Sequence, residues 1–203
     1  MMPTLYISHG SPMTAISDTP ARRFLAGLAA DLPRPRAILA VSAHWESAAP
    51  MLNAVARNAT IHDFYGFPAA LFAISYPAPG APELAETIAA RLRCAGFQPA
   101  IDRARGLDHG AWVPLYLAYP EADIPVVQLS VQTALGPHHH LALGEALADY
   151  RRLAPHAAEE HPTEEHLLPL YVALGAAGET AKAKRLHSSV EYGFLRMDAY
   201  AFG

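Results

Sequence analysis

The sequence predicts an α/β fold, in which helices flank a central, mostly parallel sheet. Two near-continuous apolar runs, at residues 37–42 and 125–131, suit strands that are buried on both faces. Such runs alternate along the chain with segments whose apolar residues recur at helical spacing. The 203 residues show no internal repeat and no evident linker, so a single domain is expected over residues 1–203.

Apolar runs bounded by Gly, Pro or polar residues mark the expected strands. These strands are placed at residues 4–8, 37–42, 51–55 and 125–131. The first run ends at a Gly-Ser-Pro turn that directly follows His9, and the second is followed by Ala43 and then His44. His9 and His44 therefore each stand at the C-terminal end of a predicted strand.

Capping residues and helical spacing mark the expected helices. They are placed from about residue 20 to the prolines at 33 and 35, at 82–94, from 138 to about 153, and from the Thr163 cap to Gly175. Successive side chains on a helix point about 100° apart. We therefore interpret His138, His139 and His140 as a polar helix start and not as ligands of one ion.

Composition and charge exclude several classes of function. A net charge of −4 provides no basic surface for nucleic acid, and no polybasic run is present for anionic lipid. No apolar stretch reaches the roughly 20 residues that cross a bilayer, and no signal peptide is recognised. The single cysteine, Cys94, cannot form an internal disulfide. These features predict a soluble cytoplasmic protein without nucleic-acid or membrane partners.

Eleven histidines direct attention to a metal or proton-transfer site. Ligands gather beyond the C-terminal ends of strands in open α/β sheets, where His9 and His44 both stand. Neutral imidazole suits Fe, Zn, Cu and Ni, and a third donor is expected from His166 or Glu165. Three donors from separate segments leave coordination positions open, as catalytic sites require. No HExxH or CxxC motif anchors this interpretation, and a lone histidine near a strand end is usually structural.

Eight segments, in unbroken order along the chain, carry a resemblance to a known family. They read LYISHGSPM, RAILAVSAHW, TIHDFYGFP, YPAPGAPELA, GLDHGAWVPL, YPEADIPVVQLS, HPTEEHLLPLYVALGAAG and EYGFLRMDAYAFG. Together they resemble the class III extradiol ring-cleavage dioxygenases, and most closely the branch of the 4,5-DOPA dioxygenase type. The resemblance implies the fold of the catalytic B subunits in this superfamily. It also implies cleavage of a catechol-type ring, DOPA-like or protocatechuate-like, by extradiol insertion of O2.

The resemblance also implies roles for individual residues. His9, His44 and His166 fall where this branch places its metal ligands, with Glu165 as a less favoured third ligand. His109, in the LDHGAW segment, matches a pocket histidine that contacts substrate or oxygen, and it is the catalytic candidate. The implied metal is Fe(II) for activity, although Zn(II) is bound by several members. The implied partners are a small aromatic diol and O2.

Four further residues are candidates for substrate binding. His62 and Asp63 are expected at the rim of the pocket, and Trp45 in its aromatic wall. Trp45 is equally well interpreted as a core residue. His187 is the fourth candidate, and His62, His109 or His187 would substitute weakly for a missing base.

The chain departs from the family pattern at residues 147–149. Family members carry there a further strand, an acid/base histidine and an aromatic-rich helix, whereas this chain passes directly into DYRRLAPHA. A true deletion, residues omitted from the chain and a gene-prediction error are the alternatives. A true deletion would uncover a sheet edge and favour a homo-oligomer. It would also make a catalytically impaired or inactive zinc-binding homologue the alternative function.

Overall fold

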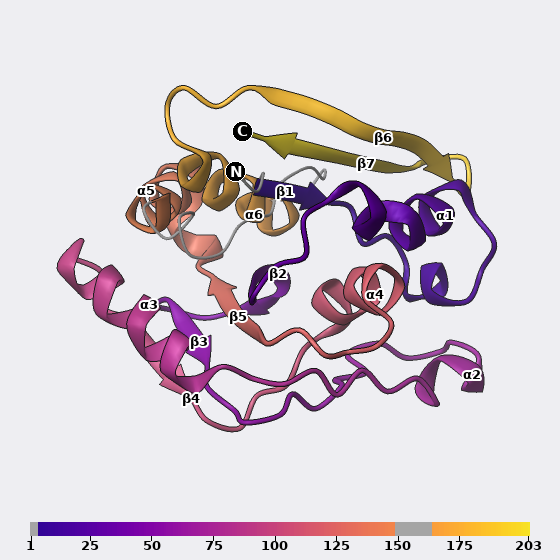
Figure 1. The fold of residues 1–203 in the computed structure, drawn as a ribbon, viewed down its shortest axis with the longest axis horizontal. Helices are drawn as coiled ribbons and strands as arrows, with labels where there is room; N and C mark the ends of the chain where they lie inside the picture. Colours follow the sequence, from indigo (N-terminus) through magenta and orange to yellow (C-terminus); the bar gives the residue numbers. More distant parts are fainter. Residues whose placement is uncertain (1–3, 149–163) are drawn as a thin grey trace.

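The computed structural model describes residues 4–148 and 164–203, which form two sheets joined by helices (Figure 1). The strands are β1 (Thr4–Ile7), β2 (Ile38–Glu46), β3 (Met51–Asn53), β4 (Ala100–Asp102), β5 (Val126–Val131), β6 (Ala183–Glu191) and β7 (Leu195–Phe202). The helices are α1 (Pro20–Gly27), α2 (Ala69–Phe72), α3 (Pro82–Cys94), α4 (His109–Ala118), α5 (Gly136–Ala148) and α6 (Glu164–Ala177). None of these helices combines the length and apolarity that a bilayer crossing requires.

The described strands pair in two separate sheets. One has the order β2-β5-β3-β4, with β2–β5 and β3–β4 parallel and β3–β5 antiparallel. The other has the order β1-β7-β6 and is antiparallel throughout. The predicted α/β fold with a mostly parallel sheet is confirmed, but the strand predicted at residues 4–8 lies in the second sheet. The reason is visible in β1, whose residues alternate between buried and half-buried, as in an antiparallel strand with one covered face.

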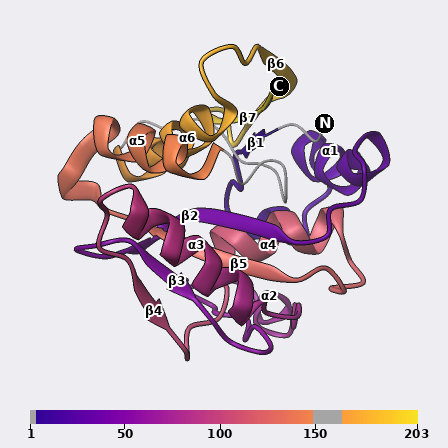
Figure 2. The same ribbon diagram turned by 60° about the vertical axis from the view of Figure 1, so that its left-hand side comes forward.

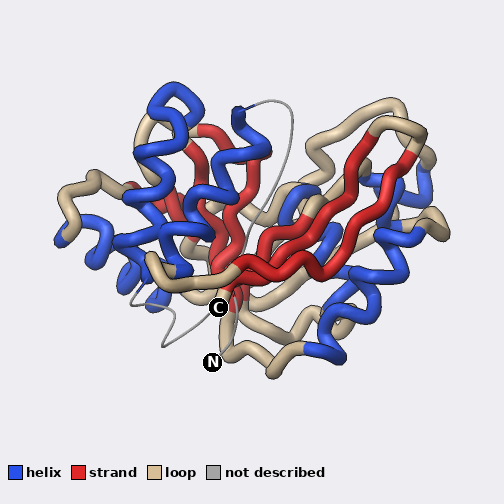
Figure 3. Tube along the Cα trace, turned by 90° about the horizontal axis from the view of Figure 1, so that it is seen from above, coloured by secondary structure: helices blue, strands red, loops and turns tan. Residues whose placement is uncertain are grey.

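Strand β5 is buried along its whole length, because helices cover both faces of the four-stranded sheet. Helices α3, α5 and α6 share one apolar core with β3 and β5, and α4 shares another on the opposite face. Helix α6 contacts strands of both sheets, β1 and β7 in one and β2 and β5 in the other (Figure 2). Figure 3 shows the two groups of strands from above. The helices between the sheets therefore bring the end of β1 close to β2.

Most predicted elements are present, with shifted ends. Helix α3 has the predicted bounds, and α1 begins as expected after Thr19, whose Oγ1 accepts a hydrogen bond from the backbone N–H of Arg22 (3.2 Å). Helix α1 ends at Gly27, earlier than predicted, because the chain tightens into a 3-10 turn at Leu28–Asp31. The predicted cap Thr163 and the predicted end of the preceding helix, at about 153, lie outside the described residues.

His140 differs from the expected polar helix start, because its ring is fully buried. Its Nε2 accepts from the backbone N–H of Gln132 (3.0 Å), and its Nδ1 donates to the carbonyl oxygen of Gly136 (2.7 Å). Burial lowers the pKa of His140 to about 4, with the Gly136 carbonyl opposing and His139 reinforcing that effect. The ring is therefore neutral at pH 7 and ties the end of β5 to the start of α5.

Candidate metal centre

Three imidazoles converge where β1, β2 and α4 meet. His9 follows β1, His44 lies near the end of β2, and His109 is the first residue of α4. The Nε2 atoms of His9 and His44 are 3.1 Å apart. Each of the three residues offers one ring nitrogen, and these nitrogens lie within 4.8 Å of one another. Donors from three segments, far apart in the sequence, are therefore gathered at one place.

The turn after β1 positions His9. Gly10 has a φ of +66°, in the left-handed region where glycine is favoured. A Cβ at Gly10 would stand 2.5 Å from the Cε of Met197 on β7. Glycine at position 10 therefore allows the chain to turn tightly against β7 directly after His9. His9 follows the end of β1, on the side where β2 lies.

His44 lies inside β2, in an irregular stretch, and not after the strand as predicted. Val41 pairs with Leu129 and Glu46 with Val131, so five steps along β2 match only two along β5. Such a bulge re-aims side chains, and here the rings of His44 and His109 lie 4.1 Å apart between centroids. His9 and His44 thus meet across two sheets and not along the edge of one parallel sheet.

Asp63 holds His109 at two points. Its Oδ1 accepts from the backbone N–H of His109, and its Oδ2 accepts from the ring Nδ1, both at 2.9 Å. Burial alone would raise the pKa of Asp63, but the hydrogen bonds and charge of His109 outweigh burial and hold that pKa below its usual value. A carboxylate can only accept, so Nδ1 carries the proton and Nε2 is the remaining nitrogen of His109.

The donor set fits a transition-metal ion. Two nitrogens that each lie about 2.1 Å from one ion are about 3.0 Å apart at a right angle and about 3.4 Å apart at a tetrahedral angle. The 3.1 Å between the Nε2 atoms of His9 and His44 lies between these values. Neutral imidazole is a ligand for iron and zinc alike, so the residues present suit either metal.

His166, the third predicted ligand, is the third residue of α6, with Glu165 directly before it. Helix α6 packs against β1 and β2, the two strands that lead to His9 and His44. His166 therefore belongs to a helix that adjoins both strands, and its side chain lies outside the described part of the structure.

Aromatic residues surround His109 on the side of the predicted pocket rim. The ring of Phe64 stands perpendicular to that of His109, with centroids 5.7 Å apart. His62 lies against Phe64 and Trp112, and its Nε2 is 3.1 Å from the carbonyl oxygen of Ile74. His62 is thus part of an aromatic group beside His109.

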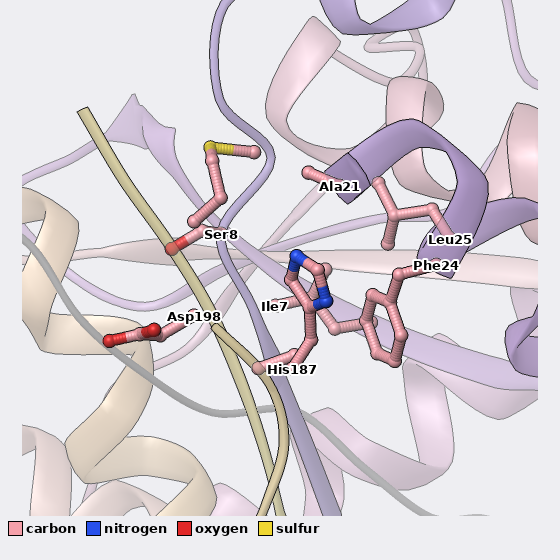
Figure 4. Close-up of a pocket in the computed structure, with 9 residues that line it drawn as sticks. Ile7, Ser8, Ala21, Phe24, Leu25, His187 and Asp198 are labelled. Atoms are coloured by element: carbon pink, nitrogen blue, oxygen red, sulfur yellow. The ribbon is translucent and has the colours of Figure 1, made fainter. Parts of the chain in front are cut away.

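Trp45 and His187 are each covered by another side chain. Trp45 is buried, and the guanidinium of Arg105 lies 4.6 Å from its ring centroid. His187, on β6, faces α1 in a recess beside β1, where its ring stacks on that of Phe24 at 4.6 Å (Figure 4). Burial lowers the pKa of His187, although nearby carboxylates oppose that effect.

Comparisons with known proteins place these residues in context. The family model described as the catalytic LigB subunit of aromatic ring-opening dioxygenase matches residues 3–156. A Beta vulgaris protein named 4,5-DOPA dioxygenase extradiol is 41% identical, over 98% of this chain and 96% of the relative. An Escherichia coli (strain K12) protein of the same name is 44% identical, over 74% of this chain and 55% of its own.

The fold has a match among solved structures, and the chain is shorter than one of its alignments. A crystal structure of an uncharacterized protein from Escherichia coli K12 matches with a TM-score of 0.81 and 28% identity, over 100% of both chains. The alignment with the Beta vulgaris protein spans 256 positions, against 203 residues in this chain. At least 53 of its positions therefore have no counterpart here.

Proposed function

Because the chain belongs to the family of the catalytic LigB subunit of aromatic ring-opening dioxygenase, we propose that it cleaves a catechol-type ring by extradiol insertion of O2. Family membership makes it an extradiol ring-opening dioxygenase, and the names of its relatives support a DOPA-like or protocatechuate-like diol as substrate. The observation that carries the proposal is the convergence of His9, His44 and His109, all of which lie within the residues that the family model matches.

The proposed metal is non-haem Fe(II), held by His9, His44 and His166, with Zn(II) able to occupy the same nitrogens. Three observations support this set: the Nε2 separation of His9 and His44, the preference of imidazole for these ions, and the packing of α6 on β1 and β2. When bound, the metal supplies a Lewis acid that acidifies the catechol hydroxyls and a redox centre for O2.

His109 is the proposed acid and base. Its Nδ1 proton is held by Asp63, which leaves Nε2 as the nitrogen that can take and return a proton. Nε2 accepts the proton of a catechol hydroxyl and returns it during ring opening. Asp63 acts through His109 and sets the orientation of its ring.

Three other side chains are proposed to bind the substrate. His62 stands in the aromatic group next to His109, where Phe64 and Trp112 offer a flat apolar wall to a planar ring. Trp45 lies under Arg105, and His187 lies against Phe24. These two are also proposed to contribute to substrate binding.

The second candidate function is a zinc-binding homologue with impaired or no turnover. The alignment positions without a counterpart support the proposal that the strand–helix segment expected near residues 147–149 is absent, and with it the acid/base histidine of the family. In this candidate His109 does not replace that histidine, and the bound zinc is structural. We also propose that a chain without this segment self-associates at an uncovered sheet edge. We propose further that the protein works in the cytoplasm.

Metal content and turnover, measured on the same samples, test these assignments. Protein loaded with Fe(II) without air is assayed as wild type, His44→Ala, His166→Ala and His109→Ala. We expect His44→Ala and His166→Ala to lose metal. We expect His109→Ala to keep its metal while turnover falls roughly 10²–10⁴-fold. Loss of metal in His109→Ala but not in His166→Ala would make His109 the third ligand and refute its proposed role. Bound metal without oxygen uptake in the wild type would favour the second candidate.

A further inference from the structure

A second carboxylate, that of Asp108, is fully buried directly before α4. Its Oδ1 accepts from the Oγ of Ser42 (2.6 Å) and from the backbone N–H of Ala111 (3.3 Å). Its Oδ2 accepts from Nη2 of Arg105 (3.1 Å) and from the side-chain amide of Gln128. A buried carboxylate is costly unless it is well hydrogen-bonded, and here donors come from β2, β5, α4 and the loop before α4. Asp108 thus connects four segments.

Two of the donors on Asp108 also hold the main chain of His44. The Oγ of Ser42 accepts from the backbone N–H of His44 (3.2 Å), and Nη2 of Arg105 donates to its carbonyl oxygen (3.3 Å). This part of β2 is the bulge, where regular pairing with β5 is interrupted. Side chains that are hydrogen-bonded to Asp108 therefore provide partners for the backbone of His44, which has no regular pairing with β5.

Asp108 also starts the helix that carries His109. It is the N-cap of α4, and its side chain accepts from the N–H of Ala111. The first turn of α4 lies so close to β2 that a Cβ at Gly110 would stand 2.4 Å from the Oγ of Ser42. One carboxylate therefore anchors both segments that bear these imidazoles.

We infer that Asp108 is a positioning residue that fixes the spacing of His44 and His109. It acts on His44 through Ser42 and Arg105, and on His109 through the start of α4. The inference rests on the proposed function only in treating His9 and His44 as metal ligands beside His109, and these three residues are called the histidine group below.

Two substitutions separate this role from ordinary stabilisation. Asp108→Asn keeps the shape of the side chain and an oxygen that can accept the hydrogen bond of the helix cap. It replaces the other oxygen by an NH2 group, which cannot accept the hydrogen bonds that Arg105 and Gln128 donate. Thr19→Ala is the matched control, because it removes the N-cap of α1 without touching the histidine group.

The first readout is Co(II) binding to folded protein, followed by its visible absorption. We expect Asp108→Asn to bind Co(II) about 10–100-fold more weakly, with a changed spectrum, as for other residues that orient metal ligands. We expect Thr19→Ala to match the wild type in both respects. Unchanged affinity and spectrum in Asp108→Asn would overturn the inference.

The second readout needs no metal. Amide hydrogen exchange at His44 is expected to become faster in Asp108→Asn while β5 stays protected, and to stay unchanged in Thr19→Ala. Unchanged exchange at His44 would overturn the inference. Where Asp108→Asn does not fold, Ser42→Ala is read in the same way, because it breaks the connection from Asp108 to the His44 amide and leaves the hydrogen bond from Arg105 to the His44 carbonyl oxygen. A wild-type protein that binds no Co(II) would contradict the proposed function, and exchange at His44 would then decide the role of Asp108.

Discussion

Replacing Gly110 by alanine is expected to damage the histidine group directly. The new Cβ would stand 2.4 Å from the Oγ of Ser42 and 2.9 Å from the Cδ2 of His44, whereas ordinary contact begins at 3.4 Å. Either α4 withdraws by about 1 Å and takes His109 with it, or the bulge of β2 moves; such overpacking costs typically ~1–3 kcal/mol. A misplacement of about 1 Å at a reacting group can reduce turnover by about 10²-fold.

Thermal unfolding and oxygen uptake of Fe(II)-loaded protein measure these effects of Gly110→Ala. A loss of about 2 kcal/mol corresponds to a fall in Tm of roughly 4–8 °C in a chain of this size. Gly27→Ala is the matched control, because no atom lies within 4 Å of its new Cβ and alanine favours the helix. If Gly110→Ala has the Tm and turnover of the wild type, the close approach of α4 to β2 does not determine the positions of His44 and His109, and our reasoning fails.

Three further substitutions test other parts of the structure. Gly144→Ala would place a Cβ 2.0 Å from the carbonyl oxygen of Val172 and push α5 from α6, so we expect chemical denaturation to show a loss of about 1–3 kcal/mol; wild-type stability would contradict that packing. The pKa of His140, about 4, lies below its ordinary 6.5, so the unfolded chain takes up the proton first and stability is lost as the pH falls from 6.5 to 4. Relative to His140→Gln, the wild type should lose about 3 kcal/mol over that window in urea titrations, and parallel curves would show that the ring is not buried as described. Asp63→Asn should keep its metal but lower kcat about 10–100-fold, because it weakens the hold on His109; an unchanged kcat would refute the role of Asp63.

Elements with strong local signals were predictable from the sequence. The bounds of α3 follow from proline in the first turn and glycine past the end, and β5 follows from an apolar run buried on both faces. Helix α4 was not predicted, because it is buried nearly all round and contains Pro114, so it shows no apolar stripe. Strands β6 and β7 were also missed; in β7 apolar and polar residues alternate only over Leu195–Ala199, and its burial does not alternate.

The histidines of the site were predictable as candidates, but their arrangement was not. His9 and His44 were identified by their places at strand ends, yet the two-sheet arrangement that brings them together depends on the pairing of β1 with β7, some 190 residues away in the chain. Asp108 was not singled out, since its role depends on hydrogen bonds to Ser42, Arg105 and Gln128. Its position as the residue directly before a helix was no help either, because α4 itself was not predicted.

Oxygen uptake in the presence of catechols tests the central claim most directly. The protein is loaded with Fe(II) without air, mixed with a panel that includes DOPA and protocatechuate, and exposed to air while oxygen and the yellow semialdehyde product are followed together. We predict that at least one catechol consumes oxygen in step with product formation, and that His9→Ala and His44→Ala abolish both. Stoichiometric metal binding without oxygen uptake for any catechol would contradict the claim.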